Sequence, residues 1–416
     1  MWQQKLFMHL PQVTIDGRPI EVVDVGRHNY DSGPDFFGAK IKIDGTYWVG
    51  NVEIHLRASD WYRHHHQTDA AYDSTILHVV ATSDADICRT DGTPISQCVL
   101  NYPEDIYGQY EQWLQKHDTV ACSDRIKLVP HVIISGWLTT LLLERLSEKA
   151  DRIDRLLEQH VNSWEDAFYI SVARNFGFHT NSQPFEQLAR SLPLSCISKH
   201  RNSLIQIEAL LFGQAGLLND AVDDYSRQLQ QEYRFLQQKF QLKPIDGSTW
   251  KMMRMRPQNL PHIRIAQFAR LMHLSPNLFG QIIDNPSPQN IRRLFDICPD
   301  TYWDTHYHFG AATSAKPKPL GQQSVNVIII NTIAPYLFVY GKRHDNHDME
   351  QAAISLLEDI PAERNAHISK CVGAGLEAHH AADTQALLQL YQNYCMPHRC
   401  LHCRIGHQVL AHHLQS

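Results

Sequence analysis

The feature that most constrains the fold is a pair of alternating segments, residues 37–43 and 47–56, joined by Asp44-Gly45. Alternation of apolar and polar residues with a period of two predicts strands with one buried face. An Asp-Gly pair between two such runs predicts a two-residue hairpin turn. In the second strand, Glu53 and His55 alternate with apolar residues. Both ionisable side chains are therefore expected to leave the sheet on the same face.

Neighbouring segments complete a small mixed sheet. Residues 20–25 predict a strand before the hairpin, and the apolar residues 76–81 predict a later strand that is covered on both faces. Between them, Ser59-Asp60 is a favourable helix start, and a short helix is expected to continue to Tyr72. The predicted order is strand, strand, strand, helix, strand.

Two carboxylates and a backbone carbonyl form the first candidate site. Asp35 lies at the entrance of the first hairpin strand, within expected reach of Glu53 across the hairpin. Together with the carbonyl oxygen of Ile54, they form the oxygen-rich ligand set that Mg or Mn prefers. Such a metal activates water and stabilises charge on a phosphate, so the predicted chemistry is phosphodiester hydrolysis.

The segments Gly33-Pro34-Asp35-Phe36 and Glu53-Ile54-His55 resemble the core of the restriction-endonuclease-like superfamily. The signature of that superfamily is Pro-Asp, a variable gap, then Glu/Asp-x-Lys. The resemblance covers about the first hundred residues. It implies that Asp35, Glu53 and His55 are catalytic, with His55 in the place of the lysine. The superfamily usually has an N-terminal helix, and residues 1–7 look like its last turns, so the full gene product is expected to start earlier.

Further polar side chains are expected to support this site. Lys40 or Lys42 is the alternative source of the ammonium group that the signature lysine would supply. The complete supporting set is Lys40, Lys42, Asp60, His66, Asp69, Tyr72 and His78. A different interpretation is a transition-metal site made of Glu53, His55 and His78, which would serve a hydrolase that acts on a small substrate. A third is a non-catalytic descendant of the nuclease fold that binds nucleic acid or protein.

Several phrases spread along the chain resemble an uncharacterised bacterial family, the domain of unknown function 2851. The resemblance spans nearly the whole chain and implies no function by itself. The phrases are Gly-Asn-Val-Glu-Ile-His at 50–55, Ser-Asp-Trp-Tyr at 59–62, Ala-Tyr-Asp at 71–73, Ile-Leu-His-Val-Val at 76–80, Ala-Arg-Asn-Phe-Gly-Phe at 173–178, Arg-Pro at 256–257, Arg-Ile-Ala-Gln at 264–267 and Cys-Leu-His-Cys at 400–403.

Helical periodicity dominates after residue 100. Helices are expected at 104–116, 133–160, 163–176, 184–191, 203–213 and 226–240. Residues 314–323, which include Pro317 and Pro319, have the composition of an extended linker. A chain of 416 residues is long enough for two or three domains. We expect an α+β protein with a nuclease-like α/β core at 1–105, a helical domain at 106–313 and a C-terminal helical region at 324–416.

One segment is free of acidic residues. No Asp or Glu occurs between Gly247 and Ile283, where basic residues accompany Trp250 and Phe268. The basic residues are Lys251, Arg254, Arg256, Arg264 and Arg270. They are candidates for contacts with the backbone of DNA or RNA, and the aromatic rings are candidates for stacking on bases. The alternative is that these charges are the solvated faces of helices that pack through their apolar residues.

The C-terminal region carries a second candidate metal site, formed by Cys395, Cys400, Cys403 and His407. Two cysteines separated by two residues can converge from a tight turn, and one further ligand on each side completes a tetrahedral zinc site. An iron-sulfur cluster is the alternative metal centre. His398 and His402 are alternative ligands. Without metal, the cysteines would be small buried apolar groups.

Composition limits the remaining classes. Nine scattered cysteines and the lack of a secretory signal suit a reduced, cytoplasmic protein. The most apolar stretch, residues 325–340, is interrupted by Asn331 and Pro335, so no membrane span is expected. The formal net charge of -6 makes nucleic-acid binding depend on a local basic face.

Overall fold

The protein is described by a computed structural model that covers residues 1–7, 10–117 and 119–411. Contacts divide the chain into two compact units. Unit 1 comprises Met1–Trp137, Lys370–Leu376 and Leu390–Ser416, and unit 2 comprises Leu138–Ser369 and Glu377–Gln389. Unit 1 contains a mixed sheet and unit 2 is mostly helical, so the predicted α+β class is confirmed. The three ranges expected from the sequence are a finer division, which stays a prediction.

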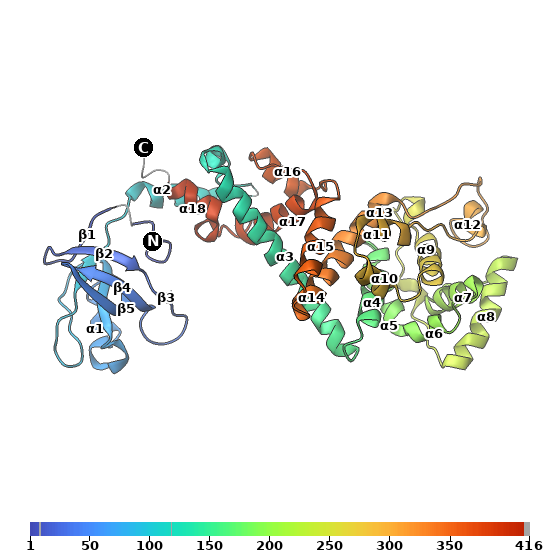
Figure 1. Ribbon diagram of the computed structural model, residues 1–416, viewed down its shortest axis with the longest axis horizontal. Helices are drawn as coiled ribbons and strands as arrows, with labels where there is room; N and C mark the ends of the chain where they lie inside the picture. Colours follow the sequence, from blue (N-terminus) through green and yellow to red (C-terminus); the bar gives the residue numbers. More distant parts are fainter. Residues whose placement is uncertain (8–9, 118, 412–416) are drawn as a thin grey trace. The chain divides into compact units, whose positions relative to one another are not determined.

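The sheet lies in unit 1 (Figure 1). In the described part of the chain it has seven strands in the order β1-β2-β4-β5-β6-β7, and β3 pairs with β4. The strands are β1 (Gln12–Val13), β2 (Pro19–Asp24), β3 (Arg27–His28), β4 (Phe36–Ile43), β5 (Thr46–Arg57), β6 (Thr75–Thr82) and β7 (Gln97–Val99). Pairing is antiparallel from β1 to β5 and parallel from β5 to β7.

The predicted hairpin between β4 and β5 is confirmed. Ile43 pairs with Thr46, and the two residues between them have positive φ angles, 49° at Asp44 and 79° at Gly45. Positive φ at both turn residues matches the right-handed twist of the flanking strands and is readily adopted by Asp-Gly. The apolar face of the hairpin packs in a core made of Ala39, Ile41, Ile43, Val52, Leu77 and Val79 together with neighbouring side chains.

The sheet nearly closes on itself because its two edges are bonded to each other. The backbone N–H of Ile15 donates to the carbonyl of Gln97 at 2.9 Å. The buried side chain of Gln12 donates to the carbonyl of Asn101 at 2.8 Å and accepts from its N–H at 3.0 Å. Edge strands with unpaired backbone groups tend to associate with other chains, and these bonds satisfy part of both edges.

Residues 2–7 form turns, so the expectation of a terminal helix there is wrong. Lys5 has a φ of 54°, which is incompatible with a right-handed helix. The turn brings the rings of Trp2 and Phe7 into a stack with centroids 4.8 Å apart, and both are buried. The indole N–H of Trp2 donates to the carbonyl of Val25 at 3.2 Å. This segment is therefore part of the sheet core.

The connection from β5 to β6 consists of three short turns of helix. They are α1 (Asp60–Arg63), η1 (His66–Thr68) and η2 (Ala70–Tyr72). The single short helix expected here is wrong because His65 has a φ of 62°, which interrupts the helical path. The Ser59 hydroxyl makes no capping bond and instead donates to Asp84 at 2.8 Å. A small second core lies beneath these turns and consists of Trp61, Tyr72, Ile87 and Ile95.

The expected helices are present, with ends that differ by up to two residues. Ser163 and Ser203 cap α4 and α7 by accepting backbone N–H bonds. The first helices are α2 (Glu104–Gln115), α3 (His131–Gln159), α4 (Trp164–Phe176), α5 (Ser182–Ser191), α6 (Leu194–Ser198), α7 (Leu204–Gln214) and α8 (Asp224–Phe240).

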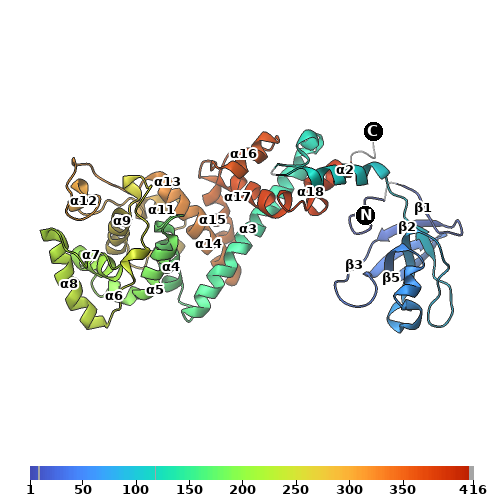
Figure 2. The same ribbon diagram turned by 180° about the vertical axis from the view of Figure 1, so that it is seen from behind.

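Shorter helices follow along the chain, and Figure 2 shows those of unit 2 from behind. They are α9 (Pro261–Leu274), α10 (Leu278–Asp284), α11 (Pro288–Leu294), α12 (Tyr302–Thr305), α13 (Gln322–Ile328), α14 (Ala334–Arg343), α15 (His347–Glu358), α16 (Ala366–Gly373), α17 (Ala381–Leu390) and α18 (Arg404–Ala411). The remaining short turns are η3 (Ser123–Leu128), η4 (Gly247–Thr249), η5 (Pro257–Asn259), η6 (Ile329–Ile333), η7 (Tyr391–Cys395) and η8 (Cys400–His402).

The segment expected to be an extended linker, residues 314–323, is irregular but packed. Lys318 is buried, and its ammonium group donates to the carbonyls of Trp303 and Asp304, the latter at 2.7 Å. Leu320 is also buried. The linker prediction is wrong because Lys318 anchors this segment to α12. The proline content of a segment indicates its backbone conformation but not whether the segment packs against the rest of the protein.

One continuous helical stretch, Gln322–Arg343, is long and apolar enough to cross a membrane by length and composition. It comprises α13, the π-helical turn η6 and α14. Its most apolar segment of 18 residues is 72% buried inside the protein, as expected of a helix in a protein core. Tyr336 in this stretch donates to the carbonyl of Ala167 at 2.7 Å, which ties α14 to α4.

Candidate metal centre

Three imidazoles meet on the polar face of the sheet in unit 1. One donor atom from each of His55, His64 and His66 lies within 4.8 Å of the other two. His55 is on β5, His64 ends α1 and His66 begins η1. Among the residues that the structure describes, no other group of at least three His, Cys, Asp or Glu side chains has this spacing.

The backbone at His65 explains why two consecutive turns contribute to this cluster. Its left-handed conformation, with a φ of 62°, redirects the chain between α1 and η1. His65 is exposed and does not join the group, whereas His64 and His66 do. Two of the three adjacent histidines therefore contribute to the cluster, and the third lies outside it.

Glu53 lies next to the imidazoles and is buried, with 5% of its surface exposed. Its Oε2 accepts the backbone N–H of Asp35 at 3.0 Å, and its Oε1 lies 3.3 Å from His55 Nε2 and 3.4 Å from His66 Nε2. Asp35 in turn accepts the N–H of Ile54 at 3.0 Å through Oδ2. The structure therefore brings Asp35, Glu53 and His55 together as expected, and their catalytic roles stay predictions.

His78 completes the buried side of the cluster. It pairs with Glu53 in the parallel register of β5 and β6, and its Nε2 lies 2.9 Å from His55 Nδ1. His55 Nε2 also lies 3.2 Å from His64 Nδ1. His55 is thus held from both sides by other imidazoles. His64 is the member that the sequence interpretation missed as a ligand, because only the turn at His65 decides its direction.

Burial sets the charge state of these groups. Burial, and then the negative charge of Asp35, raise the pKa of Glu53 to about 8. Burial and the neighbouring imidazoles lower the pKa of His55 to about 3, burial lowers the pKa of His78 to about 4, and burial also lowers the pKa of His66. At neutral pH the Glu53 carboxyl group therefore holds its proton, and the imidazoles of His55, His66 and His78 are neutral. The contacts of His55 and His66 with Glu53, at 3.3 and 3.4 Å, are therefore contacts between uncharged groups rather than ion pairs.

A divalent cation fits this arrangement. A neutral imidazole offers the lone pair that coordinates a metal, and a nearby cation favours the ionised form of a buried carboxyl group. Tyr72 stacks on His66 with ring centroids 3.7 Å apart, and this contact fixes the plane of the imidazole. The donor set is rich in nitrogen, which suits Zn, Fe, Ni or Cu better than Mg.

Two of the predicted supporting carboxylates are occupied by local structure. Asp60 accepts the N–H of Arg57 at 3.2 Å and pairs with Arg63 at 3.0 Å. Asp69 caps η2 by accepting the N–H of Ala71 at 2.9 Å. Both therefore shape the turns that carry His64 and His66.

Neither lysine on β4 supplies the ammonium group that the superfamily signature requires. Lys42 pairs with Glu21 at 3.7 Å and lies over the ring of Tyr47. Lys40 is exposed and pairs with Val49, which is four residues before Glu53. At about 3.3 Å per residue this places Lys40 roughly 13 Å along the sheet, so the expectation for both lysines is wrong.

The C-terminal cysteines do not assemble as ligands in the described part of the chain. Cys395, Cys400 and Cys403 are free thiols, and they do not form a group with metal-ligand spacing. Burial raises the pKa of Cys400 to about 11 and also raises that of Cys403, so both thiols keep their protons. His407 lies 2.7 Å from the carbonyl of Gln4 through Nε2. The zinc or iron-sulfur site predicted there is not formed.

Of the residues predicted to contact nucleic acid, some are exposed in the structure and others are buried. Lys251, Arg254 and Arg256 are exposed, and Arg270 is half-buried. Arg264 is buried and donates to Gln267 at 2.9 Å, so its guanidinium is committed to the interior of unit 2. Trp250 and Phe268, which were expected to stack on bases, are also buried. The basic segment can offer at most its exposed members to a partner, and that role stays a prediction.

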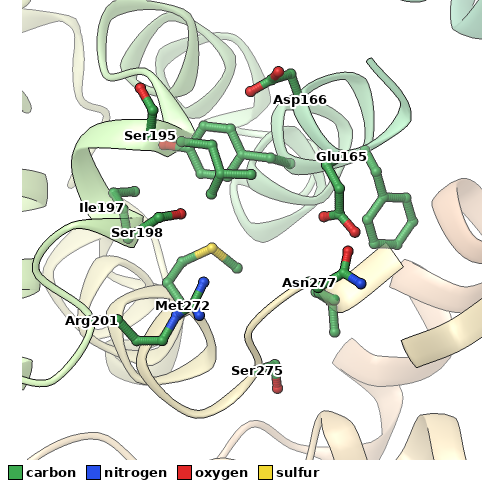
Figure 3. Close-up of a pocket in the computed structure, with 13 residues that line it drawn as sticks. Glu165, Asp166, Ser195, Ile197, Ser198, Arg201, Met272, Ser275 and Asn277 are labelled. Carbon is green, nitrogen blue, oxygen red and sulfur yellow. The ribbon is translucent and has the colours of Figure 1, made fainter. Parts of the chain in front are cut away.

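A cavity of about 340 Å³ in unit 2 is lined by α4, α6 and the ends of α9 and α10. Figure 3 shows Arg201 and Ser198 on one side of it and Glu165 and Asn277 on the other. The Glu165 carboxylate accepts the N–H of Gly280 at 3.0 Å and so caps α10. Its charge has a structural role, and the sequence interpretation placed no functional residue in this cavity.

Comparison with known proteins gives one match. No curated protein and no solved structure matches this chain. The relationship to the restriction-endonuclease-like superfamily therefore has no support from these comparisons. Residues 1–366 match the family model described as Protein of unknown function (DUF2851). This match covers most of the 416 residues, including the whole histidine cluster. The chain therefore belongs to the DUF2851 family.

Proposed function

We propose that this protein is a metal-dependent phosphodiesterase of nuclease type whose metal is held by His55, His64 and His66. The observation that supports the proposal is the position of Glu53, which is in hydrogen-bonding contact with Asp35 and lies beside two of the three imidazoles. Titratable groups whose pKa values are shifted by burial and by a charged neighbour cluster at functional sites.

The choice of metal follows from the donors. The Mg or Mn site expected from Asp35, Glu53 and the Ile54 carbonyl contained oxygen ligands only. Three imidazoles favour zinc or another transition metal, with Mn as the ion that accepts both donor types. When bound, such a metal would lower the pKa of a water molecule and polarise a phosphoryl oxygen.

The protein's own groups have distinct roles in this proposal. Glu53, once ionised, accepts a proton from the attacking water. Asp35 holds the backbone of Ile54 and so fixes β4 against β5 at the site. His78 contacts His55 Nδ1 and orients the imidazole, as partners of metal-bound histidines commonly do.

Phosphodiesters are favoured as substrates by the arrangement of the hairpin. Asp35 and Glu53 approach each other across antiparallel strands, and a parallel strand follows through a helical connection. This arrangement is the one that the restriction-endonuclease-like resemblance implies. DNA or RNA in the cytoplasm would be the partner, with the exposed residues Lys251, Arg254 and Arg256 as contacts.

A second candidate is a hydrolase that acts on a small substrate. It is favoured by the neutral, nitrogen-rich character of the cluster, which resembles a zinc site more than a magnesium site. The two candidates share the metal and differ in the size of the substrate.

The metal site is tested by measuring zinc and manganese affinity of the purified protein by competition with a chelating dye. We expect His66→Ala to weaken binding at least about tenfold, since even residues behind the ligands usually matter this much. His347→Ala is the control, because His347 is exposed, lies in unit 2 and is outside the cluster. Equal affinities for the two variants would disprove the site.

The activity is tested by incubating the protein with DNA, RNA or a small-molecule phosphodiester in the presence of Zn or Mn. We expect cleavage by wild type and a loss of at least about a hundredfold in Glu53→Gln, the range that general acid-base catalysis supplies. Glu21→Gln, on the exposed face of β2, should cleave as wild type does. Cleavage of the small ester alone would favour the second candidate. Undiminished cleavage by Glu53→Gln would contradict both.

A further inference from the structure

Unit 2 contains a cavity of about 700 Å³ that is lined by side chains of α3, α4 and η6. Its polar lining includes Lys149, Arg152, Arg174 and His179, together with neutral Ser and Asn side chains. None of the described residues that line it is acidic. We call it the basic cavity. Its size falls in the range of sites for small organic ligands, about 300–1,000 Å³.

A single half-buried carboxylate, that of Glu186, organises the two arginines. Glu186 on α5 accepts from Arg152 at 2.5 Å and from Arg174 at 2.6 Å through the same oxygen, Oε2. Helices α4 and α5, which carry Arg174 and Glu186, pack against each other (Figure 1). The arginine side chains are 40% and 33% exposed, whereas that of Glu186 is 16% exposed. The carboxylate thus lies behind the guanidinium groups, which remain open to the cavity.

The charge around the cavity is not balanced. The other oxygen of Glu186 accepts from Arg190 at 3.1 Å, so one carboxylate serves three guanidinium groups. Burial opposes ionisation of Glu186, but the three arginines hold its pKa below the usual value. Arg152 and Arg174 each use one nitrogen in these bonds, and a guanidinium group has five N–H donors. Spare donors therefore face the cavity.

Lys149 adds a third basic side chain. Its ammonium group donates to the Ile330 carbonyl at 3.1 Å, to Asn331 at 3.2 Å and to Gln385 at 3.1 Å, all of them neutral groups. Burial, and then the charge of Arg145, lower the pKa of Lys149 to about 7, although the charge of Glu363 opposes this. A half-buried lysine whose hydrogen bonds all go to neutral acceptors is stabilised when an anion binds nearby.

The remaining wall of the cavity is apolar and includes aromatic side chains. Phe178 lines it, and the ring of Phe178 is fixed by the guanidinium of Arg264, which lies 4.3 Å from the ring centroid. An aromatic surface beside two paired arginines suits a ligand with both a phosphate and a planar organic part.

We propose that the basic cavity binds a phosphate-bearing small molecule of nucleotide size, with Arg152 and Arg174 as its phosphate ligands. Two guanidinium groups that are already held in place lose little side-chain entropy on binding, and forked donors match phosphate oxygens. This site is separate from the histidine cluster and does not depend on the proposed phosphodiesterase activity.

The proposal is tested by titration calorimetry of the full chain at low salt with inorganic phosphate, adenosine monophosphate, adenosine and a single-stranded oligonucleotide that lacks terminal phosphates. We expect adenosine monophosphate to bind most tightly, phosphate more weakly, and adenosine at least about tenfold more weakly than its monophosphate. Binding of adenosine as tight as that of its monophosphate would contradict phosphate recognition. Binding of the oligonucleotide alone would also overturn the proposal.

Variants at Ser182 keep the test independent of folding. Ser182 lines the cavity and is the first residue of α5, where an acidic side chain is tolerated by the helix dipole. Ser182→Asp should weaken binding of the monophosphate at least tenfold by charge repulsion, whereas the similarly sized Ser182→Asn should not. Arg152→Lys keeps the charge and loses the fork, so it should also weaken binding. Arg155→Gln, exposed on the same helix, should bind as wild type does.

Discussion

Single residues decide the geometry of the histidine cluster. A left-handed conformation at His65 turns His64 and His66 toward His55, and this change at one residue converts a run of three histidines into a cluster. The pKa of Glu53 is raised by burial next to Asp35. On an exposed strand face the same carboxyl group would be an ordinary solvated charge.

Glu208 illustrates a buried carboxyl group outside these sites. It is fully buried in α7 and accepts bonds from Tyr225 and from the Trp303 indole, the latter at 3.1 Å. Burial raises its pKa from 4.5 to about 7, although both hydrogen bonds oppose this. The group therefore keeps its proton in the folded state while the unfolded state ionises.

The stability that Glu208 contributes depends on pH with a definite sign. It is fully present below pH 4.5, because both states are protonated, and it is lost as pH rises toward 7. We expect Glu208→Gln to gain stability relative to wild type between pH 5 and 7.5, on the order of 3 kcal/mol. Urea unfolding across this range measures the difference. Glu158→Gln, exposed on α3, serves as the control, and parallel curves for Glu208→Gln and wild type would contradict the prediction.

At the scale of elements, local sequence and packing contribute differently. The Asp44-Gly45 hairpin and the serine caps of α4 and α7 follow from local rules that act over a few residues. The connection from β5 to β6 does not, because Trp61 and Tyr72 are drawn into a core with the distant residues Ile87 and Ile95. Tertiary packing there overrides the helical pattern.

The contact between α7 and α8 requires a glycine. A Cβ atom at Gly213 would lie 2.1 Å from the ring of Tyr233, whose hydroxyl donates to Gln214 at 2.9 Å. We expect Gly213→Ala to destabilise unit 2 by about 1–3 kcal/mol, the usual cost of overpacking. Gly108 in α2 has no atom within 4 Å of the added Cβ. Gly108→Ala should therefore be neutral or stabilise by up to about 1 kcal/mol, and the same loss in both variants would contradict the packing argument.

At the scale of the whole molecule, the two units have separate cores and separate candidate sites. The histidine cluster lies in unit 1, and the basic cavity lies in unit 2. The family match over residues 1–366 includes both of them. A ligand that binds only one folded unit stabilises that unit by mass action.

Calorimetric unfolding with and without zinc tests this separation. We expect two transitions, of which zinc raises the midpoint of one and leaves the other unchanged. At a free concentration 100 times the dissociation constant, the stabilisation is about 2.7 kcal/mol. Removal of the metal with a chelator should reverse the shift. An equal shift of both transitions would show that the metal does not act through unit 1 alone.

The sequence by itself determined the elements whose signals are local: the hairpin with Glu53 and His55 on one face, the α+β class and most helices of unit 2. Only the tertiary structure decided which polar residues meet. It placed His64 beside His55 and His66, and it paired Lys42 with Glu21. It also buried Arg264 and left the C-terminal cysteines, among the described residues, without the spacing of metal ligands. The physical reason is that periodicity reports which face of an element a side chain occupies. The partner across that face comes from a distant part of the chain, and its position depends on burial and turn geometry that no local pattern encodes.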